Sequence, residues 1–261
     1  MLRKRLIFTL IYHDGYFTQS RNFRLQHVGD INWLQKNYQF KEVAFSLDEL
    51  IILDASRHEK NIMAFSNMIS EFRQNIFIPV AVGGGIKTLE DAEILFQCGA
   101  DKIVLNSVLE TNEILIKNLV NRYGSQSIIA SIDYKKNGDT ISIFIKNGES
   151  KISRSLDDYI KHIESLNAGE IYLNSIDRDG TGFGYDIETI QSIAKKIHVP
   201  LIIAGGAGNE QHLIDGLKIN GVNGVATANL FNFIGDGLLN ARTKIIQSNI
   251  NLAPWRYSLG T

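Results

Sequence analysis

The chain lacks several features that mark other classes of protein. Only one of its 261 residues is a cysteine, Cys98, so no disulfide can form within the chain, as is typical of cytoplasmic proteins. The formal net charge is −1, which argues against a broad nucleic-acid surface. No apolar run reaches the roughly 20 residues that a membrane-spanning helix needs. We therefore expect a cytoplasmic protein that binds neither nucleic acid nor a membrane.

Chain breakers and metal-ligand patterns are also scarce. Only three prolines occur, and no Pro- or Gly-rich linker divides the chain, so we expect one domain over residues 1–261. The six histidines include no pair at metal-ligand spacing. No G-x-G-x-x-G motif follows the first apolar run, which argues against a dinucleotide-binding sheet. We expect neither a metal nor a cofactor.

Eight short apolar runs alternate with longer amphipathic stretches. Hydrophobic residues make up 44% of the chain, enough for a full core. The runs are almost continuously hydrophobic, as parallel strands buried on both faces are. Eight such units in about 250 residues are typical of a TIM (β/α)8 barrel. The predicted strands are Leu6–Tyr12, Leu50–Leu53, Ile78–Val82, Lys102–Leu105, Ser127–Ile132, Ile171–Asn174, Pro200–Ile203 and Gly224–Thr227, and the predicted helices include Ile62–Phe72, Leu89–Phe96, Leu115–Tyr123, Leu156–Leu166 and Ile187–Ile197.

One segment interrupts this alternation after the fifth predicted strand. A polar stretch up to Asp139 leads into the alternating run Thr140–Ile145, and a second polar turn follows at Lys146–Glu149. Two polar turns around an alternating run predict an extra β-hairpin on this loop.

The chain repeats itself at half length. Pro79–Gly85 returns as Pro200–Gly206 at an offset of 121 residues. Leu6–Tyr12 returns as Ile128–Tyr134 at an offset of 122. We therefore expect a barrel that is built from two repeated half-barrels.

The two halves differ where matching strands end. Asp133 closes the fifth apolar run, and its counterpart in the first run is Ile11. Catalytic groups of TIM barrels lie at the carboxyl ends of strands, so Asp133 is a candidate general acid or base. A capping or loop role is the alternative, but a capping residue does not usually lie inside an apolar run. Asp54, at the end of the second strand, is a weaker candidate for which a structural role is equally supported.

Glycines and small polar side chains follow several strands at the same end of the predicted barrel. Glycine lets the backbone approach a phosphate, so that several N–H groups converge on it. The clusters occur at matching positions of the repeat, which favours two phosphate sites on opposite sides of the mouth over tight turns alone. The substrate would then carry a phosphate at each end. The candidate phosphate-binding residues are Gly84, Gly85, Asn106, Ser107, Asp179, Gly180, Thr181, Gly205, Gly206, Ala228 and Asn229.

Four charged residues begin predicted strands: Arg5, Glu49, Lys102 and Glu170. Their signs alternate along the chain, so we expect a ring of charges across the bottom of the barrel. Because the bottom face of a TIM barrel usually serves stability, the residues alone favour a stabilising salt-bridge ring.

A set of motifs resembles the cyclase subunit of imidazole glycerol phosphate synthase (HisF) over nearly the whole chain. Each glycine motif alone is weak, but together the motifs are specific. They are Lys4–Ile7, Val82–Ile86, Gly99–Lys102, Ser175–Thr181, Gly184–Asp186 and Gly205–Gly208.

The resemblance implies a duplicated half-barrel that binds a small molecule with two phosphates. It also implies a HisH-like glutaminase partner, which docks on the bottom of the barrel as a heterodimer. Ammonia from that partner passes a charged gate and travels through the barrel interior. Arg5, Glu49, Lys102 and Glu170 match the gate, so the resemblance reverses the interpretation of these four charges as purely stabilising.

This chain departs from the family at the mouth of the barrel. The family cyclase uses two aspartates. One of them is present here as Asp133, and Ile11 stands at the position of the other. Where the family has a lysine in the loop after the first strand, this chain has Gln19. Ala204 and Asn229 stand where serines are usual in the family. Losing half of an acid–base pair typically costs about 10²–10⁴ in rate. The resemblance therefore implies a weakened cyclase.

A matching gate below an altered mouth favours an ammonia conduit that serves a different acceptor. It resembles a HisF-like branch of surface-polysaccharide loci that makes acetamidino sugars with a glutaminase and a sugar amidotransferase. One alternative is the working cyclase of histidine biosynthesis, a lyase in which a water or His13 replaces the missing acid. Others are a non-catalytic scaffold that activates a glutaminase, and a related phosphosugar isomerase, which would leave the gate charges unexplained.

Overall fold

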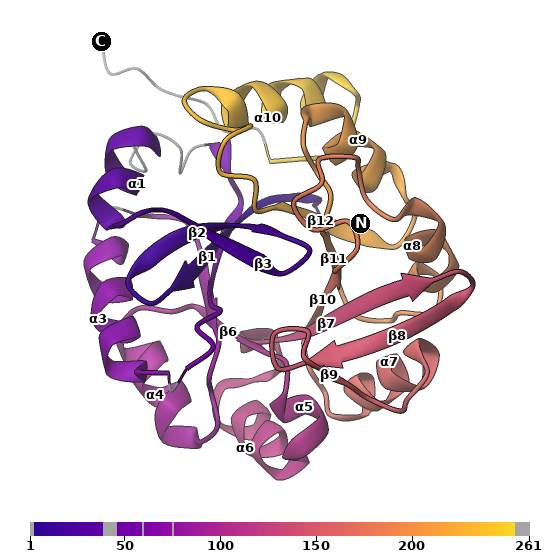
Figure 1. Cartoon of the computed structure of the whole chain (residues 1–261). Helices are drawn as coiled ribbons and strands as arrows, with labels where there is room; N and C mark the ends of the chain where they lie inside the picture. Colours follow the sequence, from indigo (N-terminus) through magenta and orange to yellow (C-terminus); the bar gives the residue numbers. More distant parts are fainter. Residues whose placement is uncertain (1–2, 39–45, 59, 75, 254–261) are drawn as a thin grey trace.

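A closed barrel of eight parallel strands forms the centre of the computed structural model, which describes residues 3–38, 46–58, 60–74 and 76–253 (Figure 1). Each predicted apolar run forms one barrel strand, and the last strand pairs with the first to close the barrel. The predicted TIM barrel is therefore confirmed. In order around the barrel, the strands are β1 (Arg5–His13), β4 (Glu49–Asp54), β5 (Val80–Gly83), β6 (Lys102–Leu105), β7 (Ile128–Asn137), β10 (Glu170–Ser175), β11 (Leu201–Ala204) and β12 (Val222–Thr227).

Helices surround the barrel. The five predicted helices form within two residues of their expected ends, except that the last of them stops at Ala194. In the described part of the chain, no helix is both long and apolar enough to cross a membrane. The helices are α1 (Ile31–Tyr38), α3 (Ile62–Arg73), α4 (Leu89–Gln97), α5 (Val108–Thr111), α6 (Glu113–Tyr123), α7 (Leu156–Ser165), α8 (Ile187–Ala194), α9 (Glu210–Lys218) and α10 (Gly237–Gln247), with a 3₁₀ turn at Ser125–Ser127.

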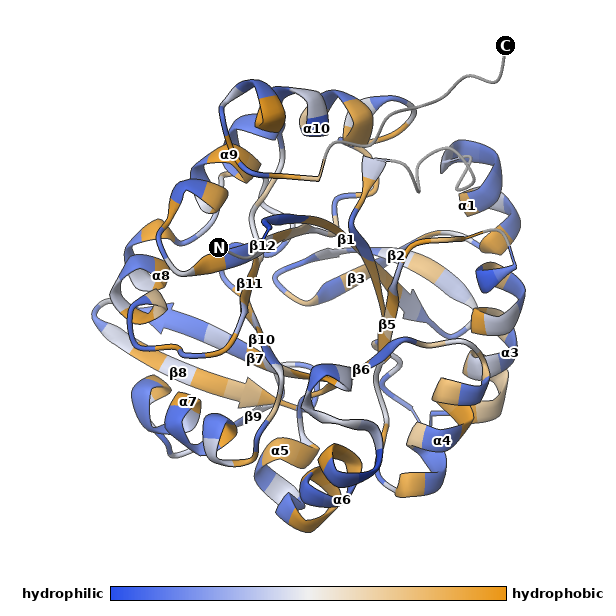
Figure 2. Cartoon of the chain, turned by 180° about the vertical axis from the view of Figure 1, so that it is seen from behind, coloured by the Kyte–Doolittle hydropathy of each residue, from blue (hydrophilic) through white to orange (hydrophobic). Residues whose placement is uncertain are grey.

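Buried apolar side chains form two separate clusters because successive residues of a strand face opposite sides. The larger cluster fills the space between the strands and the helices. The smaller one lies inside the barrel, which Figure 2 shows end-on from behind, with hydrophobic residues along the strands. The inner cluster comprises Ile7, Ile51, Ala81, Val104, Ile129, Tyr172, Ile202, Ala204 and Ala226.

The predicted hairpin after the fifth barrel strand is confirmed. β7 continues beyond the barrel to Asn137 and pairs antiparallel with β8 (Thr140–Ile145). The short strand β9 (Ser150–Lys151) then pairs with β8.

A second hairpin, which the sequence analysis missed, follows the first barrel strand. It consists of β2 (Tyr16–Arg21) and β3 (Arg24–Gly29), and β2 pairs antiparallel with β1. Asp14 and Gly15 form the turn between β1 and β2 with φ of +48° and +91°. An Asp-Gly pair between strands is a strong hairpin signal, so this element was readable from the sequence. Each half-barrel thus carries a hairpin after its first strand.

Candidate functional site

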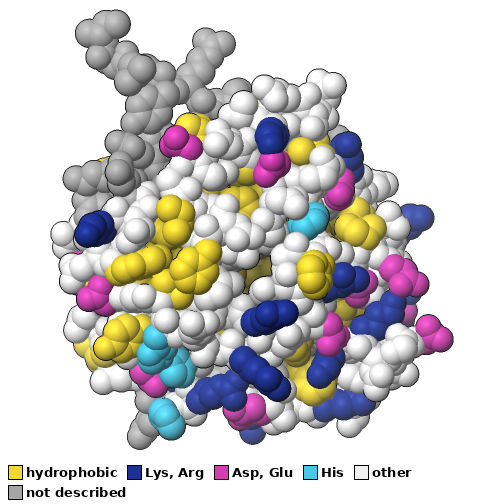
Figure 3. All heavy atoms as spheres, turned by 45° about the horizontal axis from the view of Figure 1, so that its top comes forward, with side chains coloured by type: hydrophobic (Ala, Val, Ile, Leu, Met, Phe, Trp, Pro, Cys, Tyr) yellow, Lys and Arg dark blue, Asp and Glu magenta, His cyan; other side chains and the backbone are white. Residues whose placement is uncertain are grey.

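A cavity of about 610 Å³ opens at the carboxyl ends of the barrel strands. Both hairpins contribute to its walls, with Ser20, Phe23 and Leu25 from the first and Lys146 and Asn147 from the loop that follows β8. Figure 3 shows the face of the molecule on which the hairpins lie. The cavity therefore brings residues from both halves of the chain together.

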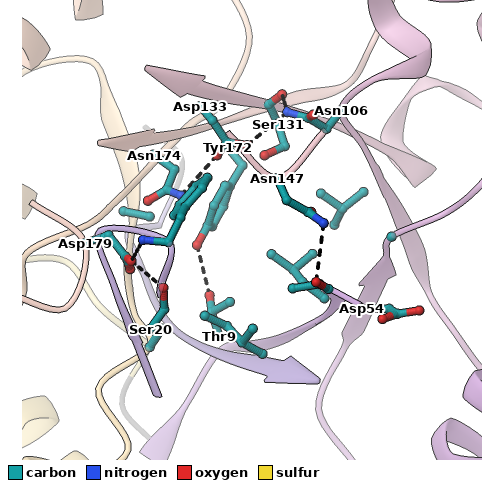
Figure 4. Close-up of a pocket in the computed structure, with 18 of the residues that line it drawn as sticks. Thr9, Ser20, Asp54, Asn106, Ser131, Asp133, Asn147, Tyr172, Asn174 and Asp179 are labelled. Atoms are coloured by element: carbon teal, nitrogen blue, oxygen red, sulfur yellow. Dashed lines mark hydrogen bonds between the residues drawn. The ribbon is translucent and has the colours of Figure 1, made fainter. Parts of the chain in front are cut away.

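Asp133 is a buried carboxylate in the wall of this cavity (Figure 4). The side-chain amide of Asn174 donates to Oδ1 at 3.0 Å, and that of Asn106 donates to Oδ2 at 3.1 Å. Burial raises the pKa of Asp133 to about 7; the hydrogen bond from Asn174 opposes this, and the charge of Asp179 adds to it. Both protonation states are therefore available near neutral pH, as a general acid or base requires.

Ile11 lines the same cavity from β1. The asymmetry between Asp133 and Ile11 in the sequence therefore lies inside one cavity. Asp54 also lines it, but its Oδ1 accepts the backbone N–H of Ser56 at 2.9 Å. This hydrogen bond stabilises the backbone of the loop that follows β4, which is a structural role for Asp54.

The structure brings all but one of the candidate phosphate-binding residues to the cavity wall. The exception is Thr181, whose hydroxyl donates to the carbonyl of Arg178 at 2.7 Å within its own turn. A Cβ at Gly84 would lie 2.2 Å from a carbonyl oxygen, and one at Gly206 would lie 2.1 Å from another. Both glycines are therefore required by the close backbone packing alone, whatever else they bind.

Asp179 connects the loop after β10 to the β2–β3 hairpin. Its Oδ2 accepts from the Ser20 hydroxyl at 2.5 Å and from the Phe23 backbone N–H at 3.0 Å. Burial raises the pKa of Asp179, although these two hydrogen bonds lower it. Asp179 therefore holds the hairpin over the cavity, and its predicted part in phosphate binding stays a prediction.

Four cationic side chains, which the sequence analysis did not single out, line one side of the cavity: Arg57, Lys60, Lys87 and Lys146. Lys60 packs over Gly85, where a Cβ would lie 2.6 Å from its Cδ, and its Nζ donates to the carbonyl of Asp54 at 2.5 Å. Burial lowers the pKa of Lys60, which the charge of Asp54 opposes and that of Lys87 reinforces.

Three of these four cations have no carboxylate partner within ion-pair distance in the part of the chain that the structure describes. Among the described residues, no carboxylate oxygen lies within 4.0 Å of the Nζ of Lys60, Lys87 or Lys146. Arg57 forms an ion pair with Glu149 at 3.1 Å. In Figure 3, Lys and Arg side chains gather toward the lower right of this face. We call the side of the cavity formed by Gly84, Gly85, Ser107 and these four cations the cationic pole.

The opposite side, which we call the backbone pole, contains Gly205, Gly206, Ala228 and Asn229. No Lys or Arg of the described chain lines the cavity here. The Asn229 side chain accepts backbone N–H groups of its own loop, from Phe231 at 3.1 Å and Asn232 at 3.0 Å. Gln19 accepts the N–H of Leu230 at 2.9 Å, so it fastens the hairpin to this pole.

The four charges at the strand starts form a closed ring of ion pairs at the other end of the barrel. Arg5 contacts Glu49 at 2.7 Å and Glu170 at 2.5 Å. Lys102 contacts the same two carboxylates at 2.8 and 2.5 Å. Glu170 keeps a lowered pKa, because the hydrogen bonds and charges of Arg5 and Lys102 outweigh its burial. Each buried carboxylate thus has two cationic partners, which offset the cost of removing its charge from water.

Comparison with known proteins places the chain in a family. The family model described as "Histidine biosynthesis protein" matches residues 20–235. The chain is 43% identical over 256 residues to a putative imidazole glycerol phosphate synthase subunit hisF2 of Parasynechococcus marenigrum (strain WH8102), covering 98% of this chain and 95% of the relative. It is 36% identical over 220 residues to the imidazole glycerol phosphate synthase subunit HisF of Pyrobaculum aerophilum, covering 84% and 85%. A putative subunit hisF2 of Pseudomonas aeruginosa is 37% identical over 237 residues, covering 90% and 93%. The chain therefore belongs to the histidine biosynthesis family, and within it to the HisF-type barrels.

Proposed function

We propose that the protein is the cyclase-type subunit of an imidazole glycerol phosphate synthase, a lyase that uses ammonia supplied by a glutaminase subunit. The observation that carries this proposal is Asp133, a carboxylate with a pKa of about 7 held between two asparagines in the barrel mouth. The names of the relatives support the cyclase over the acetamidino-sugar role that the altered mouth favours in the sequence. The cyclase, given as an alternative above, therefore becomes the main proposal.

The two poles of the cavity suit a ligand with a phosphate at each end. At the cationic pole, Lys60 and its neighbours offer positive charge beside Gly85. At the backbone pole, Gly205 and Gly206 offer N–H groups. A ligand that spans the poles would pass Asp133, which would move a proton to or from its central part.

The ring of four charges supports an entrance for ammonia at the bottom of the barrel. A HisH-like glutaminase docked there would release ammonia next to Arg5 and Glu49. Because each charge of the ring has two partners, the ring could open on one side for ammonia while every charge keeps one partner. Ammonia would then rise through the apolar interior toward Asp133.

A second candidate function is favoured by Ile11. A cavity with an aliphatic side chain where the family has a carboxylate suits an ammonia conduit whose acceptor lies on another protein, such as a sugar amidotransferase. Under this alternative the ring and the interior keep their role, and cyclase turnover is absent. A glutaminase-activating scaffold would differ from it by stimulating glutamine hydrolysis without transferring ammonia.

The first experiment is a cyclase assay. The purified protein is given the ribulosyl-formimino aminoimidazole carboxamide ribonucleotide with excess ammonium, and loss of the substrate is followed against an Asp133→Asn control. We expect turnover that the control abolishes. Absence of turnover in the folded protein would overturn the cyclase proposal and leave the conduit and the scaffold, which ammonia transfer from glutamine then separates.

A further inference from the structure

A pair of hydroxyls crosses the barrel interior between the ring of charges and Asp133. The phenol oxygen of Tyr172 on β10 lies 3.2 Å from Oγ1 of Thr9 on β1, and both side chains are buried. Two strands, β11 and β12, separate β10 from β1, so the tyrosine reaches across the barrel. Both residues line the cavity, and Figure 4 shows the tyrosine ring between Asp133 and Thr9. The pair therefore forms part of the floor of the cavity.

The position of this pair follows from the alternation of side chains on β10. Glu170, Tyr172 and Asn174 lie two residues apart and face the same side of the strand. Glu170 belongs to the ring, and Asn174 donates to Asp133. Tyr172 thus lies one layer above the ring and one layer below Asp133.

The surroundings of Tyr172 are mostly apolar, although the buried Ser131 lies opposite it on β7. Within the described inner cluster, Tyr172 is the one member whose side chain has a polar atom. A polar molecule that moves from the ring to Asp133 crosses this cluster and meets the hydroxyls of Tyr172 and Thr9 on its way.

The pair retains hydrogen-bonding capacity for a third partner. A phenol and an aliphatic hydroxyl each carry a donor and lone pairs, and one mutual hydrogen bond uses only one donor. Burial raises the pKa of Tyr172 well above its ordinary value, against the effect of the Thr9 hydrogen bond, and the charges of Asp133 and Asp179 add to the rise. The phenol therefore stays neutral, and its oxygen remains an acceptor.

We propose that Tyr172 and Thr9 bind the ammonia molecule and orient it for attack, an inference that rests on the proposed use of ammonia. Two N–H groups of ammonia donate to the phenol and hydroxyl oxygens, which leaves the nitrogen lone pair directed at the ligand beside Asp133. The lone pair forms the new C–N bond at a carbonyl carbon of the ligand, while the carbonyl π bond breaks and its electron pair moves to the oxygen, which takes up a proton from water. The nitrogen becomes positively charged and releases a proton. The ionised form of Asp133 accepts that proton. The β1 strand, which lacks a carboxylate at Ile11, would thus still contribute through Thr9.

The direct test needs neither turnover nor a partner protein. Protein labelled with ¹³C at the tyrosine ζ carbon is titrated with ammonium chloride at alkaline pH, where much of it is free ammonia, and with sodium chloride as the control. Tyr172→Phe identifies the signal. We expect a saturable shift of the Tyr172 signal with ammonia alone, an affinity about tenfold weaker in Thr9→Val, which loses one hydrogen bond, and an unchanged affinity in Thr9→Ser. A signal that responds equally to both salts would overturn the proposal.

Kinetics give the second readout. In the cyclase assay, Tyr172→Phe and Thr9→Val should raise the KM for ammonium about tenfold, again by loss of one hydrogen bond, without changing the KM for the phosphorylated substrate. Thr9→Ser should behave like the wild type. A merely structural role would instead lower thermal stability and kcat and leave the KM for ammonium unchanged, which would contradict the proposal. If the wild type shows no turnover, the cyclase proposal fails, whereas ammonia binding is still decided by the titration.

Discussion

The two half-barrels share a backbone plan but differ in the side chains that they bring to the cavity. Each begins with a strand and a hairpin, β1 with β2–β3 and β7 with β8–β9. Each also places a glycine pair after a later strand. Yet the first strand of one half ends its inward face with Ile11, and that of the other with Asp133.

This difference separates what the fold requires from what the site requires. Gly84 and Gly206 occupy matching positions, and each packs against a carbonyl oxygen too closely for a side chain. Such a backbone constraint acts on both halves equally. Lys60 and Asp133 are under no such constraint, and the position that matches Asp133 in the other half is Ile11. The two halves thus share a backbone frame, while the buried strand-end carboxylate Asp133 and the four cations of the cationic pole have no equivalent, among the described residues, in the matching strand end and the backbone pole.

The largest expected effect comes from comparing substitutions at Asp133 and Ile11, the matching strand-end residues of the two halves. Asp133→Asn should lower ammonium-dependent turnover by about 10²–10⁴, because it removes the proton-transferring group while it keeps the shape. Ile11→Val, at the matching position of the other half, should change the rate less than about twofold, since no chemistry is assigned to this side chain. Steady-state kinetics of both variants checks this. Equal losses in the two variants would mean that packing rather than Asp133 limits the reaction.

The same carboxylate should give a pH-dependent difference in stability. The pKa of Asp133 is about 7 in the folded protein, above the ordinary value of 3.8, so the folded state binds the proton more tightly. The stabilisation that the protonated Asp133 contributes is therefore complete below pH 3.8 and is lost as the pH rises from 3.8 to about 7. Asp133→Asn removes this loss, so its free energy of unfolding relative to wild type should rise by on the order of 2 kcal/mol between about pH 5 and about pH 8.

Urea unfolding of the two proteins at both pH values measures this difference. Ile11→Val serves as the matched control and should show no such pH dependence. A constant difference between Asp133→Asn and wild type would show that the carboxylate is already ionised at the lower pH.

The barrel was predictable from the sequence because buried parallel strands leave a strong pattern. All eight apolar runs became barrel strands, and the hairpin after Asp133 formed where its polar turns lie. The position of Asp133 followed from the same pattern, since a carboxylate that ends an apolar strand has to face the mouth. The Asp14–Gly15 turn carries an equally clear hairpin signal, although the sequence analysis missed it.

The rest of the site depends on contacts between residues far apart in the chain. No sequence pattern near Lys60 indicates that its side chain packs over Gly85, which lies in the loop after another strand. Tyr172 reads as one more apolar strand residue, and only the closed barrel brings its hydroxyl to Thr9. The sequence predicts that Asp179 binds phosphate, and it gives no sign that the carboxylate also holds the β2–β3 hairpin. Spacing within one strand cannot report such cross-barrel partners.

The smallest expected effect compares the two poles of the cavity. Lys60→Gln should weaken binding of inorganic phosphate about tenfold, because a partly buried lysine without a carboxylate partner gains most from an anion. Asn229→Ala, at the backbone pole, should weaken it less than about threefold, because the Asn229 oxygen is already used by its own loop. Titration calorimetry at low salt measures both, with Lys161→Gln on the exposed face of α7 as the control for net charge.

The salt dependence of the same titration sharpens the comparison. If the cationic pole binds the anion, raising the ionic strength should reduce the affinity of the wild type and should have less effect on Lys60→Gln, which has one charge fewer to screen. The Lys161→Gln control should follow the wild type. Equal affinity in Lys60→Gln and Lys161→Gln would place the phosphate at the backbone pole, and the four cations would then be a feature of the rim that does not hold the ligand.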